Sequence, residues 1–376
     1  MNVIVKYILV AVVLLTLIGV AWRYSLIPSS GTSNPVGESW SIDDETDNEP
    51  IKVVASGLRV PWGLAFLPEG GLLVTERPGN LLNIATDGTV TTIASGLGTH
   101  TSEGGLLGLA LHPDFKNNRW LYLYLTYTQG GELRNRVDRY RLADMELSDR
   151  MVIIDGIPGS SNHDGGRIAF GPDGLLYITT GDAGNRAAAQ DFDSLAGKIL
   201  RVTDDGSIPS DNFGTAVYSF GHRNPQGLAW DQAGRLWSTE HGRSGVLSGL
   251  DEINLIEQGA NYGWPESEGD TVREGTVGPA RHSGSRQTWA PASAAYFDGS
   301  LYFGGLRGEA LYEAVLQDDQ VVEVIEHFKG GYGRIRTVVV GPDGFLYMTT
   351  SNRDGRGRAS EGDDKIIRVD PKFLQP

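Results

Sequence analysis

The chain has 376 residues, and its 47 acidic side chains outnumber the 32 lysines and arginines, which gives a formal net charge of −15. This excess argues against nucleic acid and anionic membrane surfaces as partners, because both repel an acidic protein. The chain contains no cysteine, which excludes disulfides, thiolate metal sites and a lipid-modified cysteine. Its 51 glycines lie between short apolar runs, as is typical of a turn-rich all-β protein.

Residues 3–22 form an apolar run that is interrupted only by Lys6 and Thr16. A helix needs about 20 such residues to span a bilayer. We therefore predict that residues 1–26 are either an uncleaved transmembrane signal anchor or a signal peptide cleaved after Ala21. The length of the run favours the anchor, but both interpretations place the rest of the protein in the periplasm or another extracytoplasmic compartment.

Residues 27–50 contain Ser, Gly and Pro followed by acidic side chains, and they show no apolar period. Because this composition cannot bury a core, we predict an acidic flexible linker. From residue 51 to residue 371, short strand patterns follow one another, which predicts one large all-β domain. Short helical or irregular insertions are expected only at Asp182–Ala196 and Asp251–Glu257.

One hairpin pattern recurs along this domain, and its clearest copy is RIAFGPDGLLYITTGD from Arg167. An apolar strand, a Pro-Asp-Gly turn and a second strand make up this copy. Other copies begin at Gly63, Gly108, Gly227 and Thr337. The intervals between copies are 45, 59, 60 and 110 residues, and a degenerate copy in residues 294–312 divides the last of them. Since a third strand also recurs, six units of about four strands predict a six-bladed β-propeller.

The loops at one end of a propeller converge on its central channel, so residues distant in sequence can share a site. His163 precedes the first strand of the clearest hairpin and Asp182 follows the second, so we expect the two side chains to face each other. A histidine oriented by a carboxylate is what a general base requires near neutral pH. A structural histidine beside turn residues is the alternative interpretation.

Cationic residues occupy the corresponding loops of other units, although the chain as a whole is acidic. They are Arg223 with its neighbour Asn224, Arg307, Arg334 and Arg336. Separate surface ion pairs are one interpretation of these arginines. Convergence on the channel is the other, and it would suit a ligand with carboxylate groups. Asp251, Glu252 and residues 261–265 also offer carboxylate and backbone oxygens, which are ligands suited to calcium.

From about Val54 to Val369 the chain resembles the soluble, pyrroloquinoline quinone (PQQ)-dependent glucose and aldose sugar dehydrogenases. The motifs that carry the resemblance are EGGLLGLALHPDF from Glu103, NHDGGR from Asn162, GDAG from Gly181, GHRNPQGLAW from Gly221, DEINLIEQGANYGWP from Asp251 and GRIR from Gly333. GHRNPQG followed about thirty residues later by DEINL and NYGWP is the most specific combination. The family's six-bladed propeller agrees with the repeat count.

The resemblance implies a catalytic role for three residues. His163 would be the general base that takes the hydroxyl proton at the anomeric carbon while hydride passes to the quinone. Asp182 would orient this base. Arg336 would form a pair with Arg334 that binds the quinone carboxylates and polarises the reactive carbonyl.

The resemblance also implies contacts with the cofactor and with Ca²⁺. Arg223 and Asn224 would contact the quinone, while the backbone carbonyls of Gly242 and Arg243 would hold the calcium that bridges protein and cofactor. Glu252 and Tyr262 would belong to a second, structural calcium site.

Three further residues are expected to bind the cofactor but depart from the pattern of the glucose enzymes. Glu103 stands where those enzymes have Gln, Asn162 stands where they have Asp, and Arg307 lies near the position of a Lys. The loops expected to shape sugar selectivity are also short, which favours a broad aldose specificity.

The expected function is therefore oxidation of aldoses to lactones, with PQQ and Ca²⁺ as cofactors and with an electron acceptor that the sequence does not identify. A calcium-dependent lactonase and a non-enzymatic propeller that binds sugar or protein are the alternatives. The mostly cationic channel candidates disfavour the lactonase, which would need several carboxylates around one metal. The oligomeric state stays open between monomer and homodimer.

Overall fold

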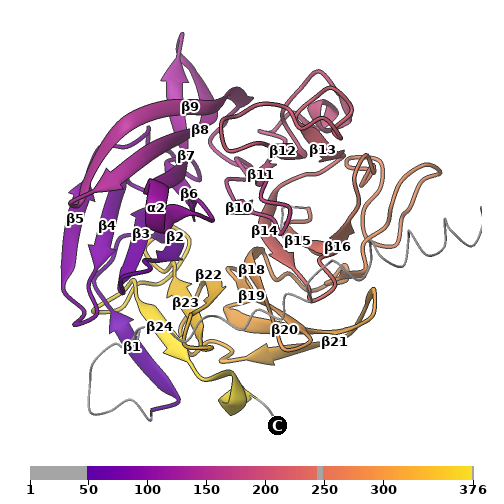
Figure 1. Ribbon diagram of the computed structural model, residues 1–376. Coiled ribbons are helices and arrows are strands. Elements are labelled where there is room, and N and C mark those ends of the chain that lie inside the picture. Colours follow the sequence, from indigo (N-terminus) through magenta and orange to yellow (C-terminus); the bar gives the residue numbers. More distant parts are fainter. Residues whose placement is uncertain (1–48, 244–248, 375–376) are drawn as a thin grey trace, which may run out of the picture. The chain divides into compact units, whose positions relative to one another are not determined.

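The computed structural model describes residues 49–243 and 249–374 (Figure 1). The predicted anchor or signal segment, residues 1–26, lies outside the described residues, as does all of the predicted linker except residues 49 and 50. No helix in the described part of the chain has the length and apolar character needed to cross a bilayer.

The described residues form six antiparallel sheets of four strands each, arranged in a ring (Figure 1). Blade 1 contains β2 (Pro61–Phe66), β3 (Leu72–Glu76), β4 (Asn80–Ile84) and β5 (Val90–Ala94). Blade 2 contains β6 (Leu106–Leu111), β7 (Trp120–Gln129), β8 (Glu132–Ala143) and β9 (Glu146–Pro158). Blade 3 contains β10 (Ile168–Phe170), β11 (Leu176–Thr180), β12 (Lys198–Val202) and β13 (Val217–Phe220).

The remaining blades follow the same order from the channel outward. Blade 4 contains β14 (Pro225–Trp230), β15 (Leu236–Glu240), β16 (Glu252–Ile256) and β17 (Arg281–His282). Blade 5 contains β18 (Pro291–Phe297), β19 (Ser300–Gly305), β20 (Ala310–Gln317) and β21 (Gln320–His327). Blade 6 contains β22 (Ile335–Val340), β23 (Leu346–Thr350), β24 (Ile366–Val369) and, as its outermost strand, β1 (Ile51–Ala55). The six-bladed propeller predicted from the repeats is confirmed.

Helices are few and short in the described residues. They are α2 (Phe115–Asn118) and the 3₁₀ turns Arg186–Gln190 and Pro371–Leu374. The first 3₁₀ turn lies within Asp182–Ala196, where an insertion was expected. The expectation for Asp251–Glu257 was wrong, because β16 occupies most of this segment and pairs with β15 from Glu240↔Glu252 to Leu236↔Ile256.

The Pro-Asp-Gly turns build the hairpins through hydrogen bonds of the aspartate. In blade 3, Gly174 has a positive φ of 75°, and the Asp173 carboxylate accepts hydrogen bonds from the backbone N of Leu175 and the hydroxyl of Tyr177. Blade 6 repeats this arrangement around Asp343. The turn therefore fixes the register of each hairpin and, with it, the positions of the loops at the opposite end.

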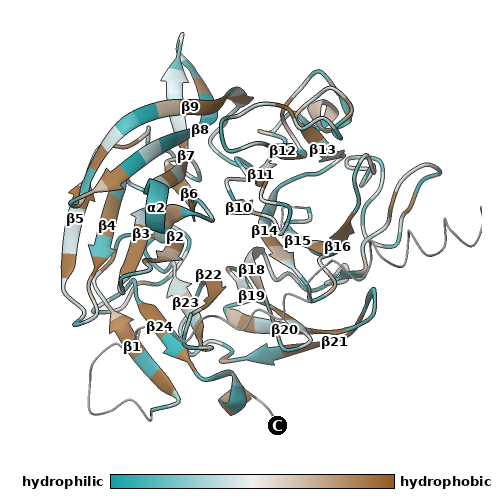
Figure 2. Cartoon of the chain, viewed as in Figure 1, coloured by the Kyte–Doolittle hydropathy of each residue, from teal (hydrophilic) through white to brown (hydrophobic). Residues whose placement is uncertain are grey.

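The apolar residues that drive folding lie in the inner strands and between blades. The innermost strand of blade 2, β6, is buried along nearly its whole length, whereas the outermost strand of blade 1, β5, is mostly exposed. Figure 2 shows brown hydrophobic and teal hydrophilic bands along many of the strands. Trp62 and Trp237 are among the largest fully buried side chains. This packing makes the inner strands a rigid support for the channel loops.

The ring is closed by pairing between strands from opposite parts of the sequence. β1 pairs with β24 from Ile51↔Val369 to Ala55↔Ile366. The backbone N of Val60 also donates to the carboxylate of Asp364, at a distance of 3.1 Å. Blade 6 is therefore completed by the strand that precedes blade 1, so the first and last strands of the propeller belong to one sheet.

Candidate active site

A cavity of about 440 Å³ lies among the loops that precede the first strands of the blades or follow their second strands. This volume lies within the range of small-molecule sites, about 300–1,000 Å³. Of the sequence-predicted residues, those that line it are Glu103, Asn162, His163, Arg223, Gly242, Arg243, Asp251, Arg307 and Arg334. The structure thus brings residues from five blades to one cavity, as the convergence of the loops predicts.

His163 and Asp182 form a hydrogen-bonded pair at the wall of this cavity. The Nδ1 atom of His163 lies 2.7 Å from Oδ1 of Asp182. Asp182 is fully buried, and its Oδ2 accepts a hydrogen bond of 2.9 Å from Nε1 of Trp264. Burial alone would raise the pKa of Asp182, but the hydrogen bonds from His163, Gly184 and Trp264 lower that pKa below its ordinary value. An ionised Asp182 accepts a hydrogen bond from Nδ1–H of His163, so Nε2 of His163 is left as the proton acceptor.

The backbone around His163 is folded so that the imidazole reaches this position. His163 has a positive φ of 62°, and the next two glycines, Gly165 and Gly166, also have positive φ values. Oδ1 of Asn224 accepts a hydrogen bond of 3.0 Å from the backbone N of Gly165. A Cβ atom at Gly181 would collide with the carbonyl oxygen of His163, so this position of the GDAG loop requires glycine.

Glu103 binds the backbone of His163 in addition to lining the cavity. Its Oε2 accepts a hydrogen bond of 2.8 Å from the backbone N of His163, and its Oε1 lies 2.6 Å from a guanidinium nitrogen of Arg356. Burial raises the pKa of Glu103, but these two partners outweigh that effect and lower the pKa below its ordinary value. The carboxylate of Glu103 therefore links the His163 loop to an arginine of blade 6.

Arg334 and Arg336 share one buried carboxylate, Asp354. The guanidinium nitrogens of Arg334 and Arg336 lie 2.8 Å and 3.6 Å from Oδ2 of Asp354. Arg336 does not line the main cavity but a void of about 20 Å³ beside it, whose lining also includes Trp62. Burial lowers the pKa of Arg336 to about 9. Holding these two arginines buried beside a single carboxylate leaves an excess of positive charge, which a bound carboxylate would offset.

Of the other two predicted cofactor contacts, Arg223 and Asn224, only Arg223 lines the cavity. Burial lowers the pKa of its guanidinium. Asn224 is fully buried behind the cavity wall, and its side-chain oxygen binds the backbone of the His163 loop. Asn224 thus supports the histidine loop directly.

The predicted calcium residues fall into two separate places. Gly242 and Arg243 line the cavity, and their carbonyl oxygens accept no hydrogen bond within residues 49–243 and 249–374. Backbone carbonyl oxygens in the wall of a cavity are ligands of the kind that a calcium ion takes. Glu252 lies behind this wall, where burial and the nearby Glu240 raise its pKa to about 8. The ring of Tyr262 stacks on His222, 4.7 Å away. No cluster of three acidic or histidine side chains in the described part of the chain could hold a metal ion.

The sequence did not reveal the roles of four residues of the site. Asp354 holds the arginine pair, Arg356 pairs with Glu103, and Trp264 binds Asp182. His241 lines both the cavity and the void, and its Nε2 has no hydrogen-bond partner in the part of the chain that the structure describes. Burial lowers the pKa of His241 to about 4, so it is a neutral imidazole. His241 and Asp354 follow second hairpin strands, as Asp182 does, and this equivalence was the available signal.

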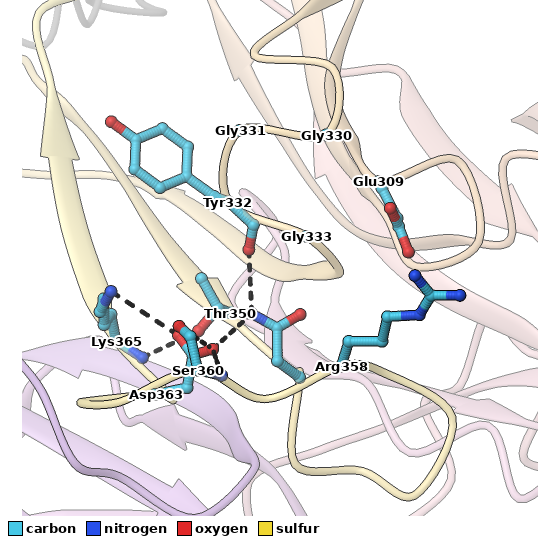
Figure 3. A pocket seen from close by; sticks show the side chains of 11 residues that line it. Glu309, Gly330, Gly331, Tyr332, Gly333, Thr350, Arg358, Ser360, Asp363 and Lys365 are labelled. Atoms are coloured by element: carbon cyan, nitrogen blue, oxygen red, sulfur yellow. Dashed lines mark hydrogen bonds and ion pairs between the residues drawn. The ribbon is translucent and has the colours of Figure 1, made fainter.

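A second cavity, of about 280 Å³, lies between the loops of blades 5 and 6 (Figure 3). Several of its polar groups bind one another. The carboxylate of Asp363 accepts hydrogen bonds from the backbone and hydroxyl of Ser360, at 2.7 and 2.9 Å, and Asn352 donates to the carbonyl of Tyr332. None of the described residues that line it is a histidine. The chemistry is therefore better placed in the first cavity.

Asp164, next to the candidate base, is a buried carboxylate with an incomplete set of hydrogen bonds. Its Oδ1 accepts hydrogen bonds of 3.0 Å from Asn135 and from the backbone N of Ser160. Its Oδ2 has no partner among residues 49–243 and 249–374. Burial accordingly raises the pKa of Asp164 to about 6, against 3.8 for an unperturbed aspartate.

This raised pKa predicts a pH-dependent stability. The folded state favours protonated Asp164, so the contribution is complete below about pH 4 and is lost as pH rises through about 6. We expect the free energy of unfolding of the wild type to fall by about 3 kcal/mol relative to Asp164→Asn between about pH 4 and pH 7. Denaturant unfolding across this range would measure the difference, with Asp149→Asn, at an exposed position of β9, as the control. Parallel pH profiles for wild type and Asp164→Asn would contradict the assignment.

Comparisons with known proteins bear on what such a cavity does. Residues 58–367 match the family model described as glucose/sorbosone dehydrogenase. The aldose sugar dehydrogenase YliI of Escherichia coli strain K12 is 33% identical over 362 residues, which cover 86% of this chain and 93% of that protein. The quinoprotein glucose dehydrogenase B of Acinetobacter calcoaceticus is 34% identical over 272 residues, 62% of this chain and 56% of that protein. The PQQ-bound aldose sugar dehydrogenase of Streptomyces coelicolor has a TM-score of 0.78 at 41% identity, covering 85% of this chain and 97% of that one.

Proposed function

The chain belongs to the glucose/sorbosone dehydrogenase family, as its motifs indicated, and we propose that it is a PQQ- and Ca²⁺-dependent aldose sugar dehydrogenase. The reaction would convert the anomeric C–OH of an aldose to the C=O of a lactone. The observation that carries the proposal is the hydrogen-bonded His163–Asp182 pair in the wall of a cavity lined by several arginines.

The proton of the sugar hydroxyl would be taken by Nε2 of His163. Asp182 stabilises the imidazolium that results, because the carboxylate is buried, ionised and hydrogen-bonded to Nδ1. Trp264 holds this carboxylate in place, and Glu103 fixes the backbone of His163. PQQ, when bound, supplies the two-electron acceptor of the reaction.

The cationic lining fits a cofactor that carries several carboxylates. Arg334 and Arg336 would bind them as charge-assisted donors, with Arg223 and Arg307 on the facing walls. Asn162 and Glu103 would border the cofactor, while Asn224 positions the histidine loop. The carbonyls of Gly242 and Arg243 would hold Ca²⁺, and Glu252 and Tyr262 would contribute to the separate structural calcium site. Export to the periplasm through residues 1–26 is part of the same proposal.

Reconstitution of the purified protein tests this function. After exhaustive chelation and dialysis, we expect no dehydrogenase activity, and we expect activity with aldoses and a dye acceptor only when both PQQ and Ca²⁺ are added. The physical reason is that the base and the arginines supply a proton acceptor and binding charge but no electron acceptor. Full activity without added quinone would refute the proposal. Hydrolysis of a lactone with Ca²⁺ alone would instead support the lactonase alternative.

A further inference from the structure

A groove of about 420 Å³ lies beside the cofactor cavity, between the loops of blades 1 and 6. Its charged or titratable lining residues are Arg59, Arg77, His100, Arg353 and Asp354. We call this feature the blade 1–6 groove. It is distinct from the cavity in Figure 3, which lies between blades 5 and 6.

Positive charge dominates the lining of the blade 1–6 groove. Asp354 is its only carboxylate among the described residues, and that carboxylate already pairs with Arg334 and Arg336. The pKa of His100 is lowered by burial and also by repulsion from Arg77 and Arg59. Three arginines thus face one groove of a chain whose net charge is −15. This local excess of positive charge is opposite in sign to the net charge of the chain, and it therefore requires a physical explanation.

Arg77 supplies a second observation that points to a ligand. Arg77 is only 5% exposed, yet its Nε has no hydrogen-bond partner in the described ranges. A terminal nitrogen donates to the carbonyl oxygen of Asp354, at 3.1 Å. Burial is the main cause that lowers the pKa of Arg77. A buried guanidinium whose hydrogen bonds are incomplete is costly unless a nearby anion offsets its charge.

The groove and the cofactor cavity are joined through shared walls. The small void lies between them. It shares Arg77, Ser102 and Asp354 with the groove. It shares Glu103, His241 and Arg356 with the cofactor cavity. A ligand in the groove would therefore lie one layer of side chains from a cofactor in the cavity. This proximity suits the transfer of electrons better than the binding of a remote effector.

We propose that the blade 1–6 groove binds the anionic group of the electron acceptor that reoxidises the enzyme. This inference rests on the proposed dehydrogenase function for its redox part, but the binding of an anion to the groove does not depend on it. Oxidation of one aldose to its lactone releases two electrons and two protons. Two ferricyanide ions would each take one electron, and the protons would pass to solvent.

The binding arm uses the redox-inert trianion hexacyanocobaltate(III) and the apoprotein. We expect saturable binding by calorimetry at low ionic strength, weakened about tenfold or more in the double variant Arg59→Gln/Arg353→Gln. Both arginines have exposed side chains outside the catalytic machinery. Arg141→Gln, at an exposed position of β8 that does not line the groove, is the matched control and should bind like the wild type. Equal affinity in all three proteins would overturn the proposed site.

The kinetic arm compares two acceptors of opposite charge in the holoenzyme. The double variant is expected to lower kcat/KM for ferricyanide about tenfold while leaving kcat/KM for the cationic acceptor phenazine methosulfate unchanged. An unchanged kcat/KM for ferricyanide in a double variant whose hexacyanocobaltate(III) binding is weakened would leave an anion site without a redox role and would overturn the acceptor assignment. Absence of turnover with either acceptor would contradict the dehydrogenase proposal, while the binding arm would still decide whether the groove holds an anion.

Discussion

Replacement of His163 by alanine is expected to lower kcat for aldose oxidation by about 10²–10⁴-fold while quinone binding stays nearly unchanged. The reason is that, in the proposed mechanism, Nε2 of His163 would take the reacting proton, whereas the cationic side chains would hold the cofactor. Turnover at saturating PQQ and Ca²⁺ would measure the loss, and a quinone titration followed by absorbance would measure binding.

A matched histidine exists elsewhere in the propeller. His327 forms a 2.8 Å pair with Glu313 and is exposed to a similar degree, 12% against 13% for His163. His327→Ala should therefore leave kcat unchanged, which separates catalysis from the loss of a histidine–carboxylate pair. Asp182→Asn is expected to fall between wild type and His163→Ala, because it misorients the imidazole without removing it. Wild-type turnover by His163→Ala would refute the mechanism even if the protein binds PQQ.

Replacement of Arg334 by alanine is expected to weaken PQQ binding by roughly 2–5 kcal/mol, which corresponds to about 30- to 5,000-fold in Kd. Arg334 lines the cavity and is held by Asp354 and by the carbonyl oxygen of Leu306, at 2.9 Å. Its removal would deprive a cofactor carboxylate of a rigid, charge-assisted partner. Equilibrium titration of the apoprotein with PQQ, without sugar, is the measurement.

Arg368 provides the control for this experiment. It belongs to the same blade and forms a 2.8 Å ion pair with Asp343, and its side chain is 7% exposed against 8% for Arg334. Arg368→Ala should lower the melting temperature without changing the Kd for PQQ. If Arg334→Ala and Arg368→Ala bind PQQ equally well, Arg334 does not contact the cofactor.

The number of blades could be predicted because each hairpin carries its own turn chemistry. Asp173 and Asp343 accept the same local hydrogen bonds. Both belong to Pro-Asp-Gly motifs that can be recognised in the sequence. Segment 251–257 could not be assigned in this way, since Ile253 and Ile256 are three residues apart, as on one face of a helix. Its strand conformation depends on pairing with β15, which is a tertiary contact.

The pairing of His163 with Asp182 could also be predicted, because both flank one hairpin whose register is local. The Glu103–Arg356 ion pair could not, because its partners are 253 residues apart and meet only when the ring is complete. The contact of Asp354 with Arg334 and Arg336 is local by contrast, because these residues flank the β22–β23 hairpin of blade 6 as His163 and Asp182 flank theirs. Residues that act across blades require the three-dimensional closure of the fold.

The β1–β24 pairing links ligand affinity to the integrity of the whole ring. The carboxylate of Asp364 accepts hydrogen bonds from the backbone N atoms of Val60 and Asn352. The side-chain oxygen of Asn352 in turn accepts a hydrogen bond of 2.9 Å from the backbone N of Arg334. A ligand that touches both Arg334 and His163 can bind fully only when this junction is intact. Such a ligand stabilises the ring with its β1–β24 junction formed, by mass action. The stabilisation is about 2.7 kcal/mol at a ligand concentration 100 times its Kd. Bound cofactor would thus stabilise the contact between Val60 and Asp364, which lie 304 residues apart in the sequence.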